Sequence, residues 1–389
     1  MLHQILVRLF GTNNIHIGKH IKPKEMEKKN HYCVIMAGGV GARFWPMSKT
    51  SRPKQFIDIL GVGKTLIQLT FERFTQICPA ENIFVVTNDI YKDLVLEQLP
   101  ALSENRVLCE PARRNTAPCV AYANYKIKEL NPEALVVVAP SDHIILKEEE
   151  FVRNIQTALK AAKENDWLLT LGIQPSRPDT GYGYIQFTGD QVYLENPMLH
   201  KVKTFTEKPN LEIAESFLAS GDFLWNSGIF IWSVKNIMFA FSTLLEEVDS
   251  LFAAGIGKYN TPDETAFIRN TYAVCKNISI DYGIMEKASN VYVLAVDFGW
   301  SDLGTWGSLY TIREKDVNQN AVVGNQVMLY DTKDCIVNMP KDKLVVLQGL
   351  RDYIVVEEDN TLLICRKEDE QQIRQIVTDV KVEKGEKYV

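Results

Sequence analysis

The sequence lacks both a long apolar run and a block of basic residues. Its longest apolar runs, such as Leu135–Ala139, are far shorter than the roughly 18 residues needed to span a bilayer. Its 43 Lys and Arg residues against 49 Asp and Glu residues give a net charge of −6. Because a mildly acidic chain without a basic cluster binds polyanions poorly, we expect no membrane and no nucleic acid among its partners.

Paired metal-binding cysteines are missing as well. The seven cysteines are scattered without a C-x-x-C pair, and three of only six histidines fall within the first twenty residues. Most of the cysteines lie in apolar runs, as buried reduced thiols usually do. We therefore expect a soluble protein of the cytoplasm, a reducing compartment, that contains no structural zinc.

The chain does have the length and apolar content for large cores. Its 389 residues are 46% hydrophobic, which excludes a disordered or fibrous protein and allows two or three domains. Residues 1–30 differ from the rest, because six basic and two acidic residues give them a net charge of +4 and leave −10 for the remainder. Arg8 interrupts their only apolar stretch, unlike in a secretory signal. We expect a dispensable, disordered extension before a natural start at Met26, with a transit peptide as the alternative.

From Tyr32 on, short apolar runs alternate with helix-like segments. Apolar runs rich in β-branched residues, without polar alternation, are typical of parallel strands covered by helices on both faces. We predict a doubly wound, mainly parallel, Rossmann-like α/β catalytic domain over residues 31–306, with ligands at the carboxyl ends of its strands. The predicted strands are Tyr32–Ala37, Ile83–Thr87, Leu135–Ala139, Leu168–Gly172, Gly228–Trp232 and Val291–Val296, and the predicted helices are Leu66–Cys78, Ile90–Leu99, Ala117–Leu130 and Glu148–Glu164.

The pattern changes after Trp306. Short β-like runs follow one another closely without intervening helices, and a single amphipathic stretch, Glu368–Val380, comes near the end. We predict a small β-rich, β-helix-like domain over residues 307–389, closed by a terminal helix.

The segment after the first predicted strand is rich in glycine. Gly38, Gly39 and Gly41 allow a tight bend that brings backbone N–H groups against phosphate oxygens. Arg43 and, further along, Lys54 can add charge-assisted contacts to those oxygens. The sequence therefore predicts a phosphate-binding loop at this position.

Two common nucleotide-binding patterns do not fit. A dinucleotide-binding fingerprint needs Gly or Ala where Phe44 stands, which weakens a dehydrogenase interpretation. The segment Gly61–Thr65 is not a Walker phosphate loop, since Asp58 occupies the place of its first glycine. Thr65 fits better as the N-cap of the following helix.

Several polar residues after strands have two explanations. Asp142 follows a predicted buried strand, where it could serve a ligand or cap a helix. Glu207 and Lys208 could bind a sugar phosphate or form a surface turn before a helix at Leu211. Asn115 could bind nucleotide or act as an N-cap. From the residues alone, these alternatives stay open.

Seven segments, in order, resemble the sugar-1-phosphate nucleotidylyltransferase family, in the version seen in mannose-1-phosphate guanylyltransferases. They are Ala37–Phe56, Arg114–Pro118, Pro140–His143, Gly181–Ile185, Phe205–Pro209, Trp225–Gly228 and Trp300–Trp306. The tail segment Gly349–Val356 also resembles this family, so the likeness leaves out only the first thirty residues.

The resemblance implies an enzyme that transfers GMP from GTP to α-D-mannose 1-phosphate, giving GDP-mannose and pyrophosphate. Phosphates are good nucleophiles and leaving groups, so a Mg²⁺-assisted in-line attack without a covalent enzyme intermediate suffices. The residues at matching positions are implied as follows: catalytic, Arg43, Lys54 and Asp142; nucleotide-binding, Gly38, Gly39, Gly41, Asn115, Pro118 and Ser141; sugar phosphate-binding, Gly181, Tyr182, Glu207, Lys208 and Asn226; Mg²⁺ ligands, Asp142 and Asp302. By analogy the family's β-rich tail suggests a homodimer. No isomerase activity is expected, because the tail lacks a histidine cluster for a metal.

Two other functions remain as alternatives. One is a nucleotidylyltransferase for another sugar 1-phosphate, such as a heptose. The other is a catalytically inactive regulatory subunit that binds a nucleotide sugar. Such a subunit is expected to have lost at least one of the charged site residues, but Arg43, Lys54, Asp142, Lys208 and Asp302 are all present. Their presence favours an active enzyme.

Overall fold

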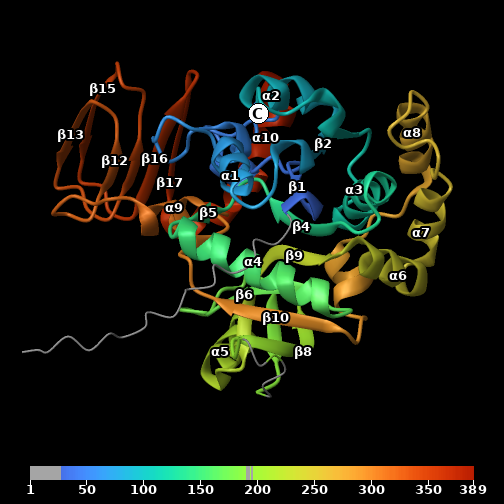
Figure 1. Ribbon diagram of the computed structural model, residues 1–389. Coiled ribbons are helices and arrows are strands. Elements are labelled where there is room, and N and C mark those ends of the chain that lie inside the picture. Colours follow the sequence, from blue (N-terminus) through green and yellow to red (C-terminus); the bar gives the residue numbers. More distant parts are fainter. Residues whose placement is uncertain (1–27, 190–192, 194–195) are drawn as a thin grey trace, which may run out of the picture.

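The computed structural model describes residues 28–189, 193 and 196–389 (Figure 1). Most of the N-terminal extension that we expected to be disordered lies outside the described residues. Its last three residues, Lys28–Asn30, are described and form a short 3₁₀ helix, η1. Asn30 takes part in the fold, because its side-chain oxygen accepts a hydrogen bond from Asn131 at 3.1 Å. Within the described residues, no helix is long and apolar enough to cross a membrane.

A nine-stranded sheet forms the larger domain, with its strands in the order β3-β2-β1-β4-β9-β6-β10-β8-β7. Their bounds are β1 His31–Met36, β2 Ile83–Asn88, β3 Val107–Glu110, β4 Leu135–Pro140, β6 Leu168–Ile173, β7 Tyr184–Phe187, β8 Leu199–Thr206, β9 Phe223–Ser233 and β10 Val291–Val296. The first four strands are parallel neighbours, as are β6 and β10. Strand β9 runs antiparallel between β4 and β6, and β7 and β8 are antiparallel too. The expected doubly wound α/β sheet is confirmed, with a parallel part and a mixed part.

Helices cover both faces of this sheet (Figure 1). Along β1, Cys33 and Ile35 join the hydrophobic core on one face, and Tyr32 and Val34 join the core on the other. Burial on both faces explains why the strands are apolar without alternation. The first face is covered by α1 (Leu66–Thr75), α2 (Lys92–Gln98), α4 (Glu148–Glu164) and α5 (Leu211–Ser220), and the second by α3 (Thr116–Leu130), α6 (Val234–Leu244), α7 (Glu246–Ala253) and α8 (Glu264–Val274).

The carboxyl ends of the central strands meet at one edge of the sheet. The backbone N–H of Ser141, just after β4, donates to the carbonyl of Met36 at the end of β1. The side chain of Gln55 donates to the carbonyls of Ala37 and Gly39, both at 3.0 Å, and so fastens the glycine-rich loop to this edge. Two short strands, β5 (Ile144–Ile145) and β11 (Trp300–Ser301), pair antiparallel and bring the residues beside them together.

The C-terminal domain is built from short parallel strands, as expected. Two sheets, β12-β14-β16-β17 and β13-β15, are parallel except for the last pair, β16 and β17. Successive strands of one face therefore stack on each other, as in a β-helix (Figure 1). The elements are α9 Trp306–Ile312, β12 Ala321–Val323, β13 Gln326–Tyr330, β14 Ile336–Asn338, β15 Leu344–Gln348, β16 Tyr353–Glu358, β17 Thr361–Arg366, η8 Lys367–Gln372 and α10 Ile373–Lys384.

A third hydrophobic core joins the two domains. It unites Phe44 and Trp45 of the catalytic domain with Ile354, Leu363 and Ile373 of the C-terminal domain. The ring N–H of Trp45 also donates to the carbonyl of Tyr388 at 2.7 Å. The segment that follows the glycine-rich loop therefore rests on the C-terminal domain.

Candidate active site

Lys54 lies at the centre of the site and is only 3% exposed. Its ammonium group is 2.8 Å from Asp142 Oδ2 and donates to the backbone carbonyls of Asp302 at 3.0 Å and Leu303 at 2.9 Å. Three acceptors thus meet the three N–H donors of a lysine. We expected Lys54 to contact phosphate, but in this structure it binds the two segments that carry the predicted metal ligands.

Gly41 makes room for this lysine. Its φ of +71° lies in the left-handed region, and a Cβ there would lie 2.6 Å from Cβ of Lys54. Gly41 is therefore needed for its backbone conformation and for the close approach of Lys54.

Both aspartates contact Lys54, Asp142 through its carboxylate and Asp302 through its backbone carbonyl. Burial raises the pKa of Asp142, but Lys54 and His143 outweigh it and hold this pKa below its usual value. Helix α4 begins only at Glu148, with Lys147 at its N-cap, so the capping explanation for Asp142 is wrong. His143 accepts a hydrogen bond from the ring N–H of Trp300 at 3.2 Å, in keeping with the pairing of β5 and β11.

Asp302 is held by two donors on one oxygen. Its Oδ1 accepts hydrogen bonds from the Tyr182 hydroxyl at 2.8 Å and from the Gly304 backbone at 3.0 Å. Among the described residues, no group of three or more His, Cys, Asp and Glu could hold a metal ion. A cation at Asp142 and Asp302 would have two protein carboxylates, which suits Mg²⁺ when phosphates and water complete its shell.

A cavity of about 460 Å³ opens beside these residues. Five predicted residues line it: Arg43, Gly181, Tyr182, Lys208 and Asp302. Lining residues that the sequence analysis missed include Arg177, Asp179, Thr305, Glu370 and Gln371. The structure therefore brings together, in one cavity, predicted catalytic and sugar phosphate-binding residues from separate segments.

Arg43 is weakly held within this cavity. One guanidinium nitrogen donates to the carbonyl of Gly304 at 3.4 Å, and its buried Nε has no hydrogen-bond partner among the described residues. The guanidinium therefore retains donors for a ligand.

The predicted sugar-binding residues form a second group of contacts. The ammonium of Lys208 lies 2.8 Å from Glu207 Oε2, and the Asn226 backbone N–H donates to the carbonyl of Gly183 at 2.8 Å. The Asn226 side chain donates to Asp281 Oδ1 at 2.8 Å. Burial, with Glu207 nearby, raises the pKa of Asp281. The sequence analysis missed Asp281, and the signal that could have found it is a lone acid in the apolar stretch 278–285.

The structure confirms the turn explanation for Lys208, and the ligand-binding one stays a prediction. Lys208 has a φ of +44° and its side chain is 63% exposed. Asn210 caps α5 by accepting from the Ile213 backbone at 2.9 Å. Lys208 is thus an exposed turn residue that also lines the cavity.

The predicted nucleotide-binding residues differ in their surroundings and in their exposure. Gly38 faces Glu110, since a Cβ at Gly38 would lie 3.7 Å from Glu110 Oε2. Asn115 caps α3 by accepting from the Thr116 backbone, as its alternative role predicted, and Pro118 is buried in the first turn of that helix. Ser141 is 2% exposed and its N–H and C=O are bonded within the protein, so it does not reach the surface of the site.

Glu110 is a residue that the sequence analysis missed. It ends β3, and its Oε1 accepts a hydrogen bond from the Tyr272 hydroxyl at 2.8 Å. Burial raises its pKa to about 7. Its other oxygen faces the glycine-rich loop, so a free carboxylate oxygen lies beside the predicted phosphate-binding segment.

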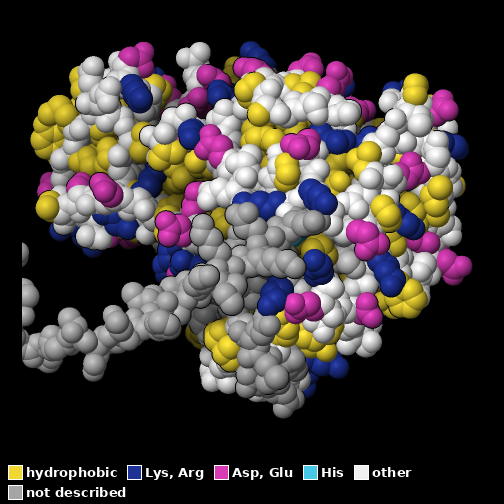
Figure 2. Space-filling model, in the orientation of Figure 1, with side chains coloured by type: hydrophobic (Ala, Val, Ile, Leu, Met, Phe, Trp, Pro, Cys, Tyr) yellow, Lys and Arg dark blue, Asp and Glu magenta, His cyan; other side chains and the backbone are white. Residues whose placement is uncertain are grey.

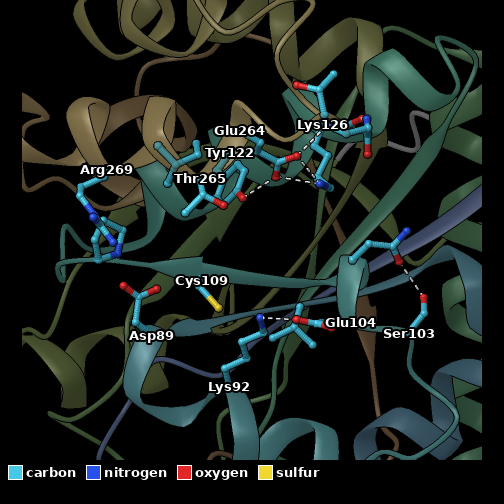
Figure 3. Close-up of a pocket in the computed structure, with 16 residues that line it drawn as sticks. Asp89, Lys92, Ser103, Glu104, Cys109, Tyr122, Lys126, Glu264, Thr265 and Arg269 are labelled. Carbon is cyan, nitrogen blue, oxygen red and sulfur yellow. Dashed lines mark hydrogen bonds and ion pairs between the residues drawn. The ribbon is translucent and has the colours of Figure 1, made fainter.

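A larger cavity, of about 840 Å³, lies beside β3, the outermost strand of the sheet (Figure 3). Lys126 and Glu264 form a buried ion pair in its wall, and the Tyr122 hydroxyl donates to the same carboxylate at 2.6 Å (Figure 3). Its described lining includes none of the residues predicted from the sequence. We therefore assign the active site to the smaller cavity.

Two family models match the chain. One is described as nucleotidyl transferase and covers residues 32–319, and the other as MannoseP isomerase/GMP-like beta-helix domain and covers residues 324–380. The first match spans the nine-stranded sheet, and the second begins just before β13.

Similar proteins extend over nearly the whole chain. The mannose-1-phosphate guanylyltransferase of Salmonella montevideo is 36% identical over 363 residues, which cover 92% of this chain and 75% of that protein. The alginate biosynthesis protein AlgA of Pseudomonas aeruginosa is 35% identical, over 89% of this chain and 71% of its own length. A crystal structure from Thermus thermophilus, titled mannose-1-phosphate geranyltransferase, is similar with a TM-score of 0.80 and 28% identity, over 90% of this chain and 99% of that one.

The bonding of Lys54 predicts a large effect on stability. Lys54→Met should lower the free energy of unfolding by about 3 kcal/mol, because it leaves Asp142 and two carbonyls without their shared donor. The matched control is Lys64→Met, which breaks a half-exposed ion pair with Glu72 at 2.7 Å. That change should cost less than about 1 kcal/mol. Urea unfolding measures both, and equal losses would contradict the assignment of a bracing role to Lys54.

Proposed function

Because the chain belongs to the nucleotidyl transferase family and is an enzyme of its mannose-1-phosphate guanylyltransferase type, we propose that it transfers GMP from GTP to α-D-mannose 1-phosphate and releases GDP-mannose and pyrophosphate. The sugar phosphate oxygen attacks the α-phosphorus of GTP, and the bond from that phosphorus to the bridging oxygen of pyrophosphate breaks. The proposal includes no covalent enzyme intermediate, because the sugar phosphate is already a good nucleophile and pyrophosphate a good leaving group.

One observation carries this proposal: a single cavity joins Arg43, Lys208 and Asp302. The reaction brings two anionic substrates together. It therefore needs a positively charged side chain to bind each substrate and a carboxylate to bind a metal ion. Lys208, beside Glu207, can bind the phosphate of the sugar, while Glu207 can accept a hydrogen bond from a sugar hydroxyl. Arg43, with its unused donors, can hold the triphosphate.

We propose that Asp142 and Asp302 hold Mg²⁺. Lys54 takes Oδ2 of Asp142, while Tyr182 and Gly304 share Oδ1 of Asp302. The oxygens that would face a cation are therefore Oδ1 of Asp142, which lies 4.0 Å from His143 Nε2, and Oδ2 of Asp302. When bound, Mg²⁺ supplies charge neutralisation for the facing phosphates. Lys54 acts by tying the Asp142 carboxylate to the backbone of Asp302 and Leu303.

We further propose that Glu110 selects guanine. An ionised carboxylate only accepts hydrogen bonds. Guanine presents two adjacent donors, N1–H and N2–H, on one edge, whereas the corresponding edge of adenine alternates donor and acceptor. Tyr272 occupies Oε1 of Glu110, and the other oxygen faces the loop at Gly38. This arrangement supports GTP as the nucleotide.

The homodimer remains a proposal as well. On the outer face of β13 and β15 the exposed side chains include Met328, Tyr330, Leu344 and Val346. Figure 2 shows hydrophobic side chains gathered on this domain. A second copy that covers this face would remove the apolar surface from water, and sedimentation velocity tests it.

The proposed function is tested by a pyrophosphate-release assay that crosses four nucleoside triphosphates with several sugar 1-phosphates. We expect turnover to be highest with GTP and mannose 1-phosphate. Faster turnover with a heptose 1-phosphate would assign a different sugar. Absence of turnover, with binding of GDP-mannose retained, would indicate the regulatory subunit.

Asp142→Asn and Asp302→Asn should each nearly abolish turnover, because each removes a negative charge that a hard cation needs. Excess Mg²⁺ should restore part of the rate. Since both carboxylates serve one ion, the double variant should be little worse than the poorer single variant. Rates of the three variants are measured against a magnesium titration. Near-wild-type turnover of either single variant at limiting Mg²⁺ would remove that residue from the metal site.

Lys208→Ala should raise the apparent KM for mannose 1-phosphate by about tenfold or more, because a charge-assisted contact to its phosphate is lost. The KM for GTP should change much less, since Arg43 faces the triphosphate. Initial rates at varied concentrations of each substrate measure both constants. If the GTP constant suffers more, this loop has been assigned to the wrong substrate.

The raised pKa of Glu110 predicts that GTP binding depends on pH. Burial raises its pKa to about 7, so the carboxylate is ionised above that pH and protonated below it. The KM for GTP should therefore rise as the pH falls below about 7, because a protonated acid no longer accepts both guanine donors. Glu110→Gln should raise this KM by about tenfold and remove the pH dependence. A variant that keeps the wild-type profile would show that Glu110 does not read the base.

A further inference from the structure

The wall of the active-site cavity includes residues of the C-terminal domain. Glu370 and Gln371 line it together with Arg43 and Asp302. Both lie in η8, between the last strand of that domain and its closing helix, within the region that matches the β-helix family model. The catalytic domain alone therefore does not close the cavity.

Glu370 contacts the turn that follows Asp302. Its Oε2 accepts a hydrogen bond from the backbone N–H of Gly307 at 2.7 Å. A Cβ at Gly307 would lie 3.1 Å from Oε1 of the same carboxylate. Glu370 thus lies directly against the first turn of α9, a few residues after Asp302.

The same carboxylate acts on Arg43. Burial lowers the pKa of the Arg43 guanidinium, and the nearby Arg374 lowers it further. Asp302, Glu370 and Asp179, which line the same cavity, oppose both effects and stabilise its charge. Among the described residues Arg43 makes a single long hydrogen bond, to the carbonyl of Gly304, so its guanidinium is free to respond to these charges.

We propose that Glu370 is a positioning residue for nucleotidyl transfer: its carboxylate offsets Arg374 and holds Arg43 beside Asp302, so the C-terminal domain completes the active site. The inference rests on the proposed function, in which Arg43 acts on the triphosphate. Without the negative charge of Glu370, repulsion from Arg374 moves Arg43 away from its working position. A misplacement of this kind lowers the rate even though no group that touches substrate is removed.

The test uses Glu370→Gln, which keeps an oxygen for the Gly307 N–H and removes only the charge. Its kcat should fall by about tenfold or more, while the KM for mannose 1-phosphate stays within about twofold of wild type. The double variant Glu370→Gln/Arg374→Gln removes the opposing charge as well and should recover most of kcat. A structural role alone would give no such recovery.

The matched control is Glu368→Gln. Glu368 lies in the same turn, is 72% exposed and pairs with Arg366 at 3.3 Å. Its kcat should equal that of wild type. Equilibrium titration with GTP, without the sugar phosphate, gives a second readout: Glu370→Gln should bind GTP more weakly and the double variant should recover.

The outcomes are distinct. Wild-type kcat and GTP affinity in Glu370→Gln would overturn the inference and leave the proposed function intact. Equal losses in the single and double variants would also overturn it, since the charge balance with Arg374 would then play no part. Failure of the wild-type enzyme to join GTP to any sugar 1-phosphate would contradict the proposed function, while the GTP titration would still decide whether Glu370 positions Arg43.

Discussion

The arrangement of the site depends on the ammonium group of Lys54. A buried cation is tolerated only when acceptors replace the water it has lost. Here those acceptors are Asp142, after β4, and the carbonyls of Asp302 and Leu303, after β11. If these segments separated, they would leave a buried charge unpaired. Lys54 itself reaches them only because Gly41 has no side chain in the way. The glycine-rich loop therefore serves the geometry of the metal ligands as well as the approach of phosphate.

The second constraint is the shared core between the domains. Arg43 is followed directly by Phe44 and Trp45, which pack against the C-terminal domain, and Trp45 also donates to Tyr388. The backbone position of Arg43 is therefore set by packing, and its guanidinium faces a cavity that Glu370 also lines. In this account the β-rich domain is a structural part of the active site. Removing it would displace Arg43 while leaving the central sheet in place.

The sequence predicted what depends on local pattern. Continuous apolar runs located the central strands, and the helix Glu148–Glu164 was predicted with the bounds that the structure has. In the C-terminal region, the β-like runs Ala321–Val323, Gln326–Tyr330 and Leu344–Leu347 match β12, β13 and β15 to within a residue. The strand β8 alternates buried and exposed side chains only partly, so its pattern was not strong enough to be recognised. The three-residue strand β14 was missed as well. The antiparallel direction of β9 is not encoded in its apolar composition either.

The parts of the site that could not be predicted are those fixed by distant contacts. Asp142 was a candidate because it follows a predicted strand, and the family resemblance added Asp302. The role of Lys54 required knowing that the Asp142 carboxylate and the Asp302 backbone carbonyl reach the same ammonium. Glu110, Asp281 and Glu370 act through partners far along the chain, namely Tyr272, Asn226 and Gly307. Nothing in the residues around them indicates those partners. The sequence thus identified the chemistry of the cavity, and packing between distant segments decided which residues complete it.

The central claim is that Lys54 braces the Asp142 carboxylate against the backbone that carries Asp302, and does not bind phosphate. A crystal structure of the enzyme with GDP-mannose and Mg²⁺ tests it most directly, through the distances from the Lys54 ammonium. The account predicts hydrogen bonds of about 2.7–3.2 Å to Asp142 and to the carbonyls of Asp302 and Leu303, with no phosphate oxygen in that range. A Lys54 ammonium that has left those carbonyls and bonds a phosphate oxygen instead would contradict the account.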